Sequence, residues 1–242
     1  MIQFPMFSTS KLTSFRKQIY FDNGFLIFKK FLPKNVILRI QEFWRHDHSY
    51  QFSSFIKNRD VSPGCRDYVY NRPTAEDFSY CVHLWNKPFD EELHETAYRI
   101  QTLRNILEGK PLYHGLHEAT GKYLQYRICK TISEGQAVYK HADFMEETRA
   151  DPAGNHSFDP IRLQATLFLS DYGNHYDNGG FFLYDSTDQE KQLFGKDIPV
   201  NAGDLVFWRY SLSHEISGVT ALDRSLGFLR VIYPLFDLKE PT

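Results

Sequence analysis

The chain has 242 residues, of which 42% are hydrophobic and 24% are charged. This composition is that of an ordinary globular protein, which excludes collagen-like, coiled-coil and broadly disordered chains. The formal net charge of −2 lacks the basic surplus of nucleic-acid-binding and membrane-surface proteins, so we expect neither kind of partner. The length fits one large domain, and we expect residues 1–242 to form it.

The cysteines and the N-terminal segment indicate where the protein resides. Cys65, Cys81 and Cys129 are an odd, widely spaced set, which predicts neither a disulfide framework nor a structural zinc site. Free thiols are typical of a reducing compartment, and we expect a cytoplasmic protein. Residues 1–7 lack the basic start of a secretory signal, and no apolar run in the sequence reaches membrane length.

The first half of the chain, residues 1–121, is expected to be a support region of one strand and two helices. The opening residues are polar and unpatterned, and residues 45–88 carry no clear periodicity. Apolar side chains recur every three or four positions before Gly109, as on one face of a helix. The predicted elements are a strand at 24–28 and helices at 33–44 and 89–107.

From residue 122 the sequence changes to short aromatic and β-branched runs separated by Gly, Asn, Asp and Pro. This texture is typical of an antiparallel sandwich or barrel. We therefore predict a mainly β (α+β) fold, a jelly roll over residues 122–236 with helices packed on one sheet. The expected strands are 123–131, 136–143, 162–170, 180–184, 204–210 and 226–234, with two short ones near Gln192 and His214.

The predicted strand 136–143 contains a histidine and a carboxylate two positions apart. Strand alternation places His141 and Asp143 on one face, and His214 follows a later strand. Two imidazoles and one carboxylate form a facial triad, which suits Fe(II) and leaves three coordination positions open. The sequence therefore offers these three residues as candidate metal ligands.

A second pair, His175 and Asp177, has the same spacing. With 10 His and 30 Asp plus Glu in the chain, such a tripeptide arises by chance about once, so spacing alone does not decide. This second pair lies within the turn-forming residues 173–180, where we expect a loop that does not hold its side chains rigidly.

The flanking pattern favours the first pair. Four blocks occur in order between residues 122 and 234: GQAVYKHAD at 135–143, RLQATLFLSD at 162–171, NGGFFLY at 178–184 and AGDLVFW at 202–208. With these blocks the chain resembles the iron(II)/2-oxoglutarate-dependent oxygenase superfamily, and most closely its prolyl 4-hydroxylase-type catalytic domain. The resemblance implies a double-stranded β-helix with helices packed on its outer sheet.

The resemblance also implies roles for individual residues. His141, Asp143 and His214 would hold Fe(II), and Arg224 would pair with the distal carboxylate of 2-oxoglutarate. Arg230, six positions later, is the nearby competitor of Arg224. The tyrosine that often precedes the first block is Ile132 here, so Tyr126 and Thr166 are the candidates for a second cosubstrate contact.

The implied activity is hydroxylation of an aliphatic C–H bond with decarboxylation of 2-oxoglutarate to succinate. Its cofactors would be Fe(II), 2-oxoglutarate and dioxygen, with ascorbate as a candidate reductant. We expect a small-metabolite substrate, because no accessory binding domain remains once the core is assigned. Desaturation, ring formation, a peptidyl (prolyl-type) hydroxylase and a non-catalytic or cupin-like jelly-roll module stay open, as does the oligomeric state. Residues 146–160 are the candidate for a substrate lid.

Overall fold

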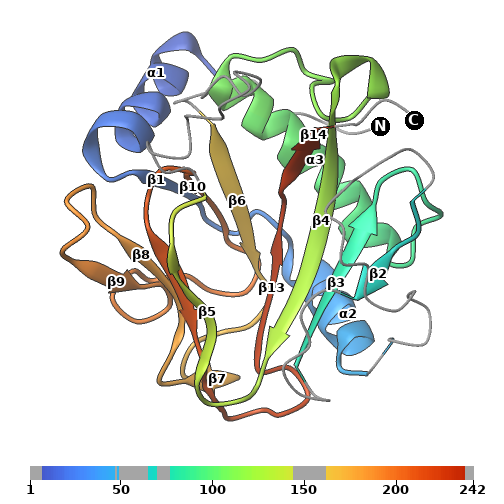
Figure 1. Ribbon diagram of the computed structural model, residues 1–242, viewed down its shortest axis with the longest axis vertical. Coiled ribbons are helices and arrows are strands. Elements are labelled where there is room, and N and C mark those ends of the chain that lie inside the picture. Colours follow the sequence, from blue (N-terminus) through green and yellow to red (C-terminus); the bar gives the residue numbers. More distant parts are fainter. Residues whose placement is uncertain (1–6, 47, 49–64, 70–76, 144–161, 238–242) are drawn as a thin grey trace, which may run out of the picture.

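Two antiparallel sheets face each other, and helices cover the outer side of the larger one (Figure 1). The computed structural model describes residues 7–46, 48, 65–69, 77–143 and 162–237. This arrangement is the predicted jelly roll with helices on one sheet, so the expected fold class is confirmed. The expected lid at 146–160 lies outside the described residues.

The larger sheet combines strands from both ends of the chain. Its order is β1-β10-β6-β13-β4-β3-β2, and β14 pairs with β4. The strands are β1 (Phe25–Phe28), β2 (Tyr68–Val69), β3 (Phe78–His83), β4 (Lys122–Thr131), β6 (Leu163–Phe168), β10 (Leu205–Arg209), β13 (Phe228–Ile232) and β14 (Leu235–Asp237).

The smaller sheet faces the part of the larger one that is formed by β1, β10, β6 and β13. Its order is β5-β11-β8-β9, and two further short strands, β7 and β12, pair with each other. The bounds are β5 (Gln136–His141), β7 (Tyr176–Asp177), β8 (Gly180–Tyr184), β9 (Lys191–Leu193), β11 (His214–Ser217) and β12 (Thr220–Ala221). The predicted strands therefore all exist, most of them shorter by one or two residues at the ends.

Three α-helices are described: α1 (Thr9–Lys17), α2 (Lys34–Trp44) and α3 (Glu91–Glu108). A π-helical turn (Gln18–Asp22) follows α1, and a 3-10 turn (Glu118–Thr120) precedes β4. Asp90 caps α3 by accepting from the Leu93 amide, and Gly109 ends it at a φ of 73°. Within the described residues, no helix has the length and apolar character needed to cross a bilayer.

Helix α1 and strand β3 were not predicted. Helix α1 buries none of its residues, so it has no strong apolar stripe to detect. Ser8 caps its start, Arg16 donates to the Leu107 and Ile106 carbonyls at the end of α3, and Leu12 and Phe15 are partly buried against the core. Strand β3 was not predicted because five of its six residues are buried, so its sequence lacks the alternation of apolar and polar residues that indicates a strand.

Strand alternation divides the interior into two cores. Leu229 and Val231 of β13 pack with the helices, whereas Phe228 packs between the two sheets. The same division holds on β6, where Ala165 faces the helices and Phe168 the other sheet. In β6 and β13, residues of one parity therefore face the helices and those of the other parity face the smaller sheet.

Substitution of Gly203 tests how closely α2 packs against the start of β10. Its φ is +91°, and an added Cβ would overlap Ile37 Cδ1 and lie 3.0 Å from the Leu32 carbonyl oxygen. We expect Gly203→Ala to lower the free energy of unfolding by about 2–4 kcal/mol, from backbone strain and overpacking together. Denaturant-induced unfolding measures the change.

Gly173→Ala is the matched control. Its φ is +78°, but nothing lies within 4 Å of an added Cβ. In this variant the free energy of unfolding should fall only by the part due to backbone strain, about 1 kcal/mol. Equal losses in the two variants would show that the close approach of Ile37 contributes nothing.

Candidate functional site

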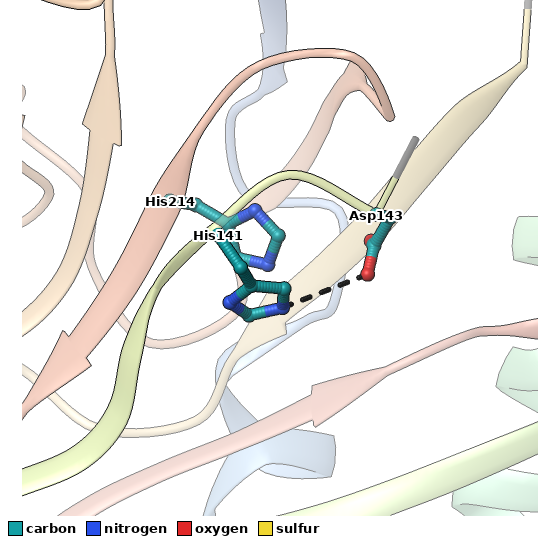
Figure 2. Close-up of side chains that lie close together, drawn as sticks. All are labelled: His141, Asp143 and His214. Carbon is teal, nitrogen blue, oxygen red and sulfur yellow. Dashed lines mark ion pairs between the residues drawn. The ribbon is translucent and has the colours of Figure 1, made fainter. Parts of the chain in front are cut away.

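Three side chains that sequence analysis singled out meet at one end of the space between the sheets (Figure 2). His141 ends β5, His214 begins β11, and Asp143 lies on a bend two residues after His141. Their potential ligand atoms all lie within 4.8 Å of one another. Among the described residues, this is the only group of three or more His, Cys, Asp or Glu side chains with such spacing.

Strand pairing brings the two histidines together. His141 and His214 are direct partners in the β5–β11 ladder, and their ring centroids are 4.2 Å apart. Directly opposed residues of an antiparallel pair project to the same face with Cβ atoms about 4.5–5.5 Å apart. The sheet register therefore sets the separation of these two ligands.

A β-bulge turns His141 toward the interior. Val138 pairs with Ile216 and His141 with His214, so β5 has one more residue than β11 between these pairs. In a regular strand, residues three apart face opposite sides, but the bulge places His141 on the inner side together with Val138. Lys140 points outward, where its Nζ lies 2.8 Å from Asp188 Oδ2.

The position of Asp143 differs from the sequence expectation. We expected a continuous strand to 143, with alternation directing Asp143 like His141. The strand ends at His141, and Asp143 reaches the cluster from a bend, with its Oδ1 at 3.7 Å from His141 Nε2. The two residues converge as expected, but the chain turn rather than the pleat brings them together.

Both imidazoles are oriented through their Nδ1 atoms. His141 Nδ1 is 2.7 Å from the Tyr139 carbonyl oxygen, and His214 Nδ1 is 3.3 Å from that of Leu212. A carbonyl only accepts, so each Nδ1 carries the hydrogen and each Nε2 keeps a free lone pair. Metal-binding histidines are commonly fixed in this way, with the second nitrogen bonded to a backbone carbonyl or carboxylate.

The cluster is buried on one side and open on the other. His214 is 8% exposed and its ring lies 4.4 Å from that of Trp208, whereas the side chains of His141 and Asp143 are 42% and 29% exposed. Burial lowers the pKa of His214, against the opposing effect of the Asp143 carboxylate. His214 is thereby favoured in the neutral form that binds a metal.

Thr166 lies next to this cluster, inside the space between the sheets. It is 1% exposed on β6, and its Oγ1 accepts a hydrogen bond of 3.2 Å from Trp208 Nε1, the indole that contacts His214. Its hydroxyl hydrogen is therefore left for another acceptor.

The two candidate arginines occupy different environments. Arg224 is exposed on the turn between β12 and β13. Arg230 is 5% exposed and lies on the same side of β13 as Phe228, with its guanidinium 4.5 Å from that ring and its Nη1 3.3 Å from Thr131 Oγ1. Arg230 forms no ion pair with a described residue. Burial lowers the pKa of Arg230, and the Asp77 carboxylate is near enough for its charge to oppose this effect.

Tyr176 is a residue that sequence analysis did not single out as a ligand-binding group. It is 0% exposed between the sheets, its hydroxyl has no hydrogen-bond partner among the described residues, and burial raises its pKa. Arg230 is near enough for its charge to oppose this rise. The sequence signal was masked, because Tyr176 stands inside the rival motif that we assigned to a loop.

Tyr126 lies apart from the cluster. It is 1% exposed in the core between β4 and the helices, and its hydroxyl is 3.4 Å from His94 Nδ1 on α3. Its position on β4 has the parity that faces the helices, as Leu124 and Ile128 do. This placement argues against the predicted contact between Tyr126 and 2-oxoglutarate.

The rival pair His175 and Asp177 does not form a ligand group. His175 Nδ1 accepts from the Asp171 amide at 2.9 Å, and Asp177 accepts from the Asn178 amide at 2.7 Å on the surface. Both residues therefore make local contacts in the segment between β6 and β8, where Tyr176 and Asp177 form strand β7 instead of the expected loop.

Comparison with known proteins supports the fold. The sequence matches no protein-family model and no curated protein. The structure is similar to a Pseudomonas putida prolyl-4-hydroxylase, with a TM-score of 0.54 and 14% identity over 95% of this chain and 100% of that chain. The chain has the fold of the 2-oxoglutarate and Fe(II)-dependent oxygenases.

Two further solved structures with this fold contain ligands. The epimerase SnoN, in complex with Fe3+, α-ketoglutarate and nogalamycin RO, has a TM-score of 0.53 and 14% identity over 95% of this chain and 85% of its own. A Trichoplax adhaerens prolyl hydroxylase, in complex with a hypoxia inducible factor peptide fragment, has a TM-score of 0.50 and 13% identity over 96% and 94%. The sequence-based resemblance is thus confirmed at the level of the fold.

Replacement of a clustered histidine tests the metal site. We expect His141→Ala to weaken Fe(II) binding by at least about 100-fold, because it removes one of three ligands. Anaerobic equilibrium dialysis of the full chain with Fe(II) measures the affinity. His175→Ala is the matched control and should bind Fe(II) as the parent does. Loss in the His175 variant alone would assign the metal to the turn instead.

Proposed function

We propose that this protein is an iron(II)- and 2-oxoglutarate-dependent oxygenase that hydroxylates an aliphatic C–H bond of a small metabolite. The observation that carries the proposal is the convergence of His141, Asp143 and His214, with their ligand atoms within 4.8 Å. Two imidazoles and one carboxylate with an exposed side form the donor set that suits Fe(II) and leaves positions open.

The residues present fit a bound ferrous ion. The Nε2 atoms of His141 and His214 are free of other contacts to carbonyl groups, and Asp143 supplies the anionic ligand. When bound, iron with 2-oxoglutarate and dioxygen supplies the oxidation that converts C–H to C–OH while 2-oxoglutarate becomes succinate and carbon dioxide. The protein contributes binding, orientation and exclusion of water.

Polar groups between the sheets support a dicarboxylate site near the proposed metal ligands. Thr166 and Arg230 are diagonal neighbours on the inner face, because Thr166 pairs with Ile232 two residues beyond Arg230. The Tyr176 hydroxyl lacks a partner in the same interior. A carboxylate placed there would satisfy the guanidinium and this hydroxyl together. We propose Arg230, rather than Arg224, as the residue that binds the distal carboxylate of 2-oxoglutarate.

A small metabolite is the proposed substrate, and a peptide is the alternative. Support for the first is that the described helices and strands all belong to the two-sheet core and its covering layer. Structural similarity to prolyl hydroxylases, one of them bound to a peptide fragment, favours the second. Succinate release screened against metabolites and against proline-containing peptides distinguishes the two.

Anaerobic addition of Fe(II) and then 2-oxoglutarate tests the proposed cofactor chemistry. Chelation of the ferrous ion by the keto acid should produce a weak visible charge-transfer band that saturates at one equivalent of iron. The band should be absent when succinate replaces 2-oxoglutarate, because succinate lacks the 2-keto group. Intact, iron-loaded protein that gives no band would favour a jelly-roll metal protein that uses no 2-oxoglutarate.

The two arginines are distinguished by the same spectroscopic titration. Arg230→Gln should raise the 2-oxoglutarate concentration for half-maximal band by about 30-fold, because a charge-assisted contact of about 2 kcal/mol is lost. Arg224→Gln should change it less than about threefold, as expected for an exposed cation. Fe(II) affinity and thermal unfolding of each variant serve as controls. A larger effect in the Arg224 variant would return the carboxylate contact to that residue.

A further inference from the structure

A cavity lies away from His141, Asp143 and His214, between α2, α3 and the start of β10. Its volume is about 1130 Å³, and its walls come from the β1–α2 connection, α2, one residue of α3, and the turns before β7 and β10. Figure 1 shows α2 at the lower right, away from β5. None of its lining residues belongs to the group His141, Asp143 and His214.

The lining of the cavity combines cationic and apolar side chains. Lys29, Lys30, Lys34 and Arg99 line it, together with Phe31 and Leu38. Lys34 begins α2, whose first turn has no side-chain cap. Arg99 lies over the Phe31 ring at 5.2 Å. An anion with an apolar body would meet both parts of this surface.

The two carboxylates of the cavity are already engaged. Asp204, 2% exposed, accepts from the amides of Lys30 and Asn201 at 2.7 and 2.9 Å and from Lys29 Nζ at 2.9 Å. Asp171 accepts from the Ala202 amide at 2.7 Å. In the part of the chain that the structure describes, Lys30, Lys34 and Arg99 have no carboxylate partner. The lining therefore keeps an excess of positive charge.

The walls are fixed before any ligand binds. The Leu32 amide donates to the Gly203 carbonyl at 3.1 Å, and Gln41 Nε2 donates to the Leu169 carbonyl at 2.7 Å. Lys30 has a φ of 53°, in the left-handed region where glycine or asparagine is the unstrained choice. The Asp204 carboxylate, which accepts from the Lys30 amide, stabilises this strained backbone conformation.

The turn that carries His175 contributes a neutral donor. His175 Nδ1 accepts from the Asp171 amide, so its Nε2 carries the hydrogen, and His175 lines the cavity. Asn174 and Asn201 add carboxamide groups to the same wall. The motif that does not bind metal therefore has a place in this cavity.

The cavity and the metal cluster lie at opposite ends of β10. The lining residues Asn201–Asp204 precede this strand, and His214 follows it after a short turn. Five residues of strand separate the two by roughly 15 Å. A ligand in the cavity therefore leaves the ligand atoms of the metal cluster accessible.

We propose that this cavity, which we call the basic cleft, binds an organic phosphate monoester. The four cations Lys29, Lys30, Lys34 and Arg99 exceed the two carboxylates Asp171 and Asp204 by two charges, which matches the dianion of a monoester. The Phe31 and Leu38 side chains receive its apolar body. This assignment stands independently of the chemistry at the metal cluster.

Calorimetric titration of the full chain with phenyl phosphate tests the basic cleft. We expect one site per chain, with an affinity that falls as salt is raised, since exposed cations are screened. Lys34→Gln and Arg99→Gln should each weaken binding by about five- to tenfold. Lys87→Gln, an exposed lysine outside the lining, is the matched control and should leave binding unchanged.

Two comparison ligands distinguish the contribution of the anionic charge from that of the apolar part of the ligand. Inorganic phosphate should bind more weakly than phenyl phosphate, and toluenesulfonate, a monoanion of similar shape, more weakly still. Bound phenyl phosphate should protect Lys30 and Lys34, but not Lys87, from acetylation read by mass spectrometry. No saturable binding, equal binding of the sulfonate, or equal loss in the Lys87 variant would each overturn the proposal.

Discussion

The antiparallel pairing of β5 with β11 is the constraint on which the site depends. It makes His141 and His214 direct partners, although they are far apart in the sequence, and a bulge in β5 turns His141 inward. The chain then bends after β5, and Asp143 closes the group. A shift of this register by one residue would send His214 to the outer face and dissolve the cluster. The remaining elements act by holding these two strands in place against the larger sheet.

The two faces of the larger sheet have different roles, because successive residues of each strand point to opposite faces. One set, including Tyr126, Leu229 and Val231, binds the helices and provides the main core. The other set, including Thr166 and Arg230, faces the opposite side of the sheet, where Thr166 accepts from Trp208 and Arg230 lies at the Phe228 ring. Burial of a guanidinium and of an unpartnered tyrosine hydroxyl is unfavourable unless a ligand satisfies them. We therefore attribute these groups to binding of a dicarboxylate rather than to stability.

Sequence reasoning found the sheet, two of the helices and the three clustered residues, because strand periodicity and the His-x-Asp spacing are local signals. It missed α1, which has no fully buried residue and is tied to α3 by Arg16, and β3, most of whose residues are buried. It favoured Arg224 over Arg230 on the resemblance to the oxygenase superfamily; in the structure Arg224 is exposed on the turn before β13 and Arg230 is buried. Side-chain direction after a turn depends on tertiary packing, which one sequence does not reveal.

We propose that one ferrous ion binds to two imidazoles and one carboxylate of this chain. X-ray absorption spectroscopy of the full chain, loaded anaerobically with one equivalent of Fe(II), tests this binding because imidazole rings add a characteristic outer-shell scattering. We expect scattering from two imidazoles, reduced to one in the His214→Ala variant. A spectrum of oxygen ligands alone, or one that the His214 substitution leaves unchanged, would contradict the account.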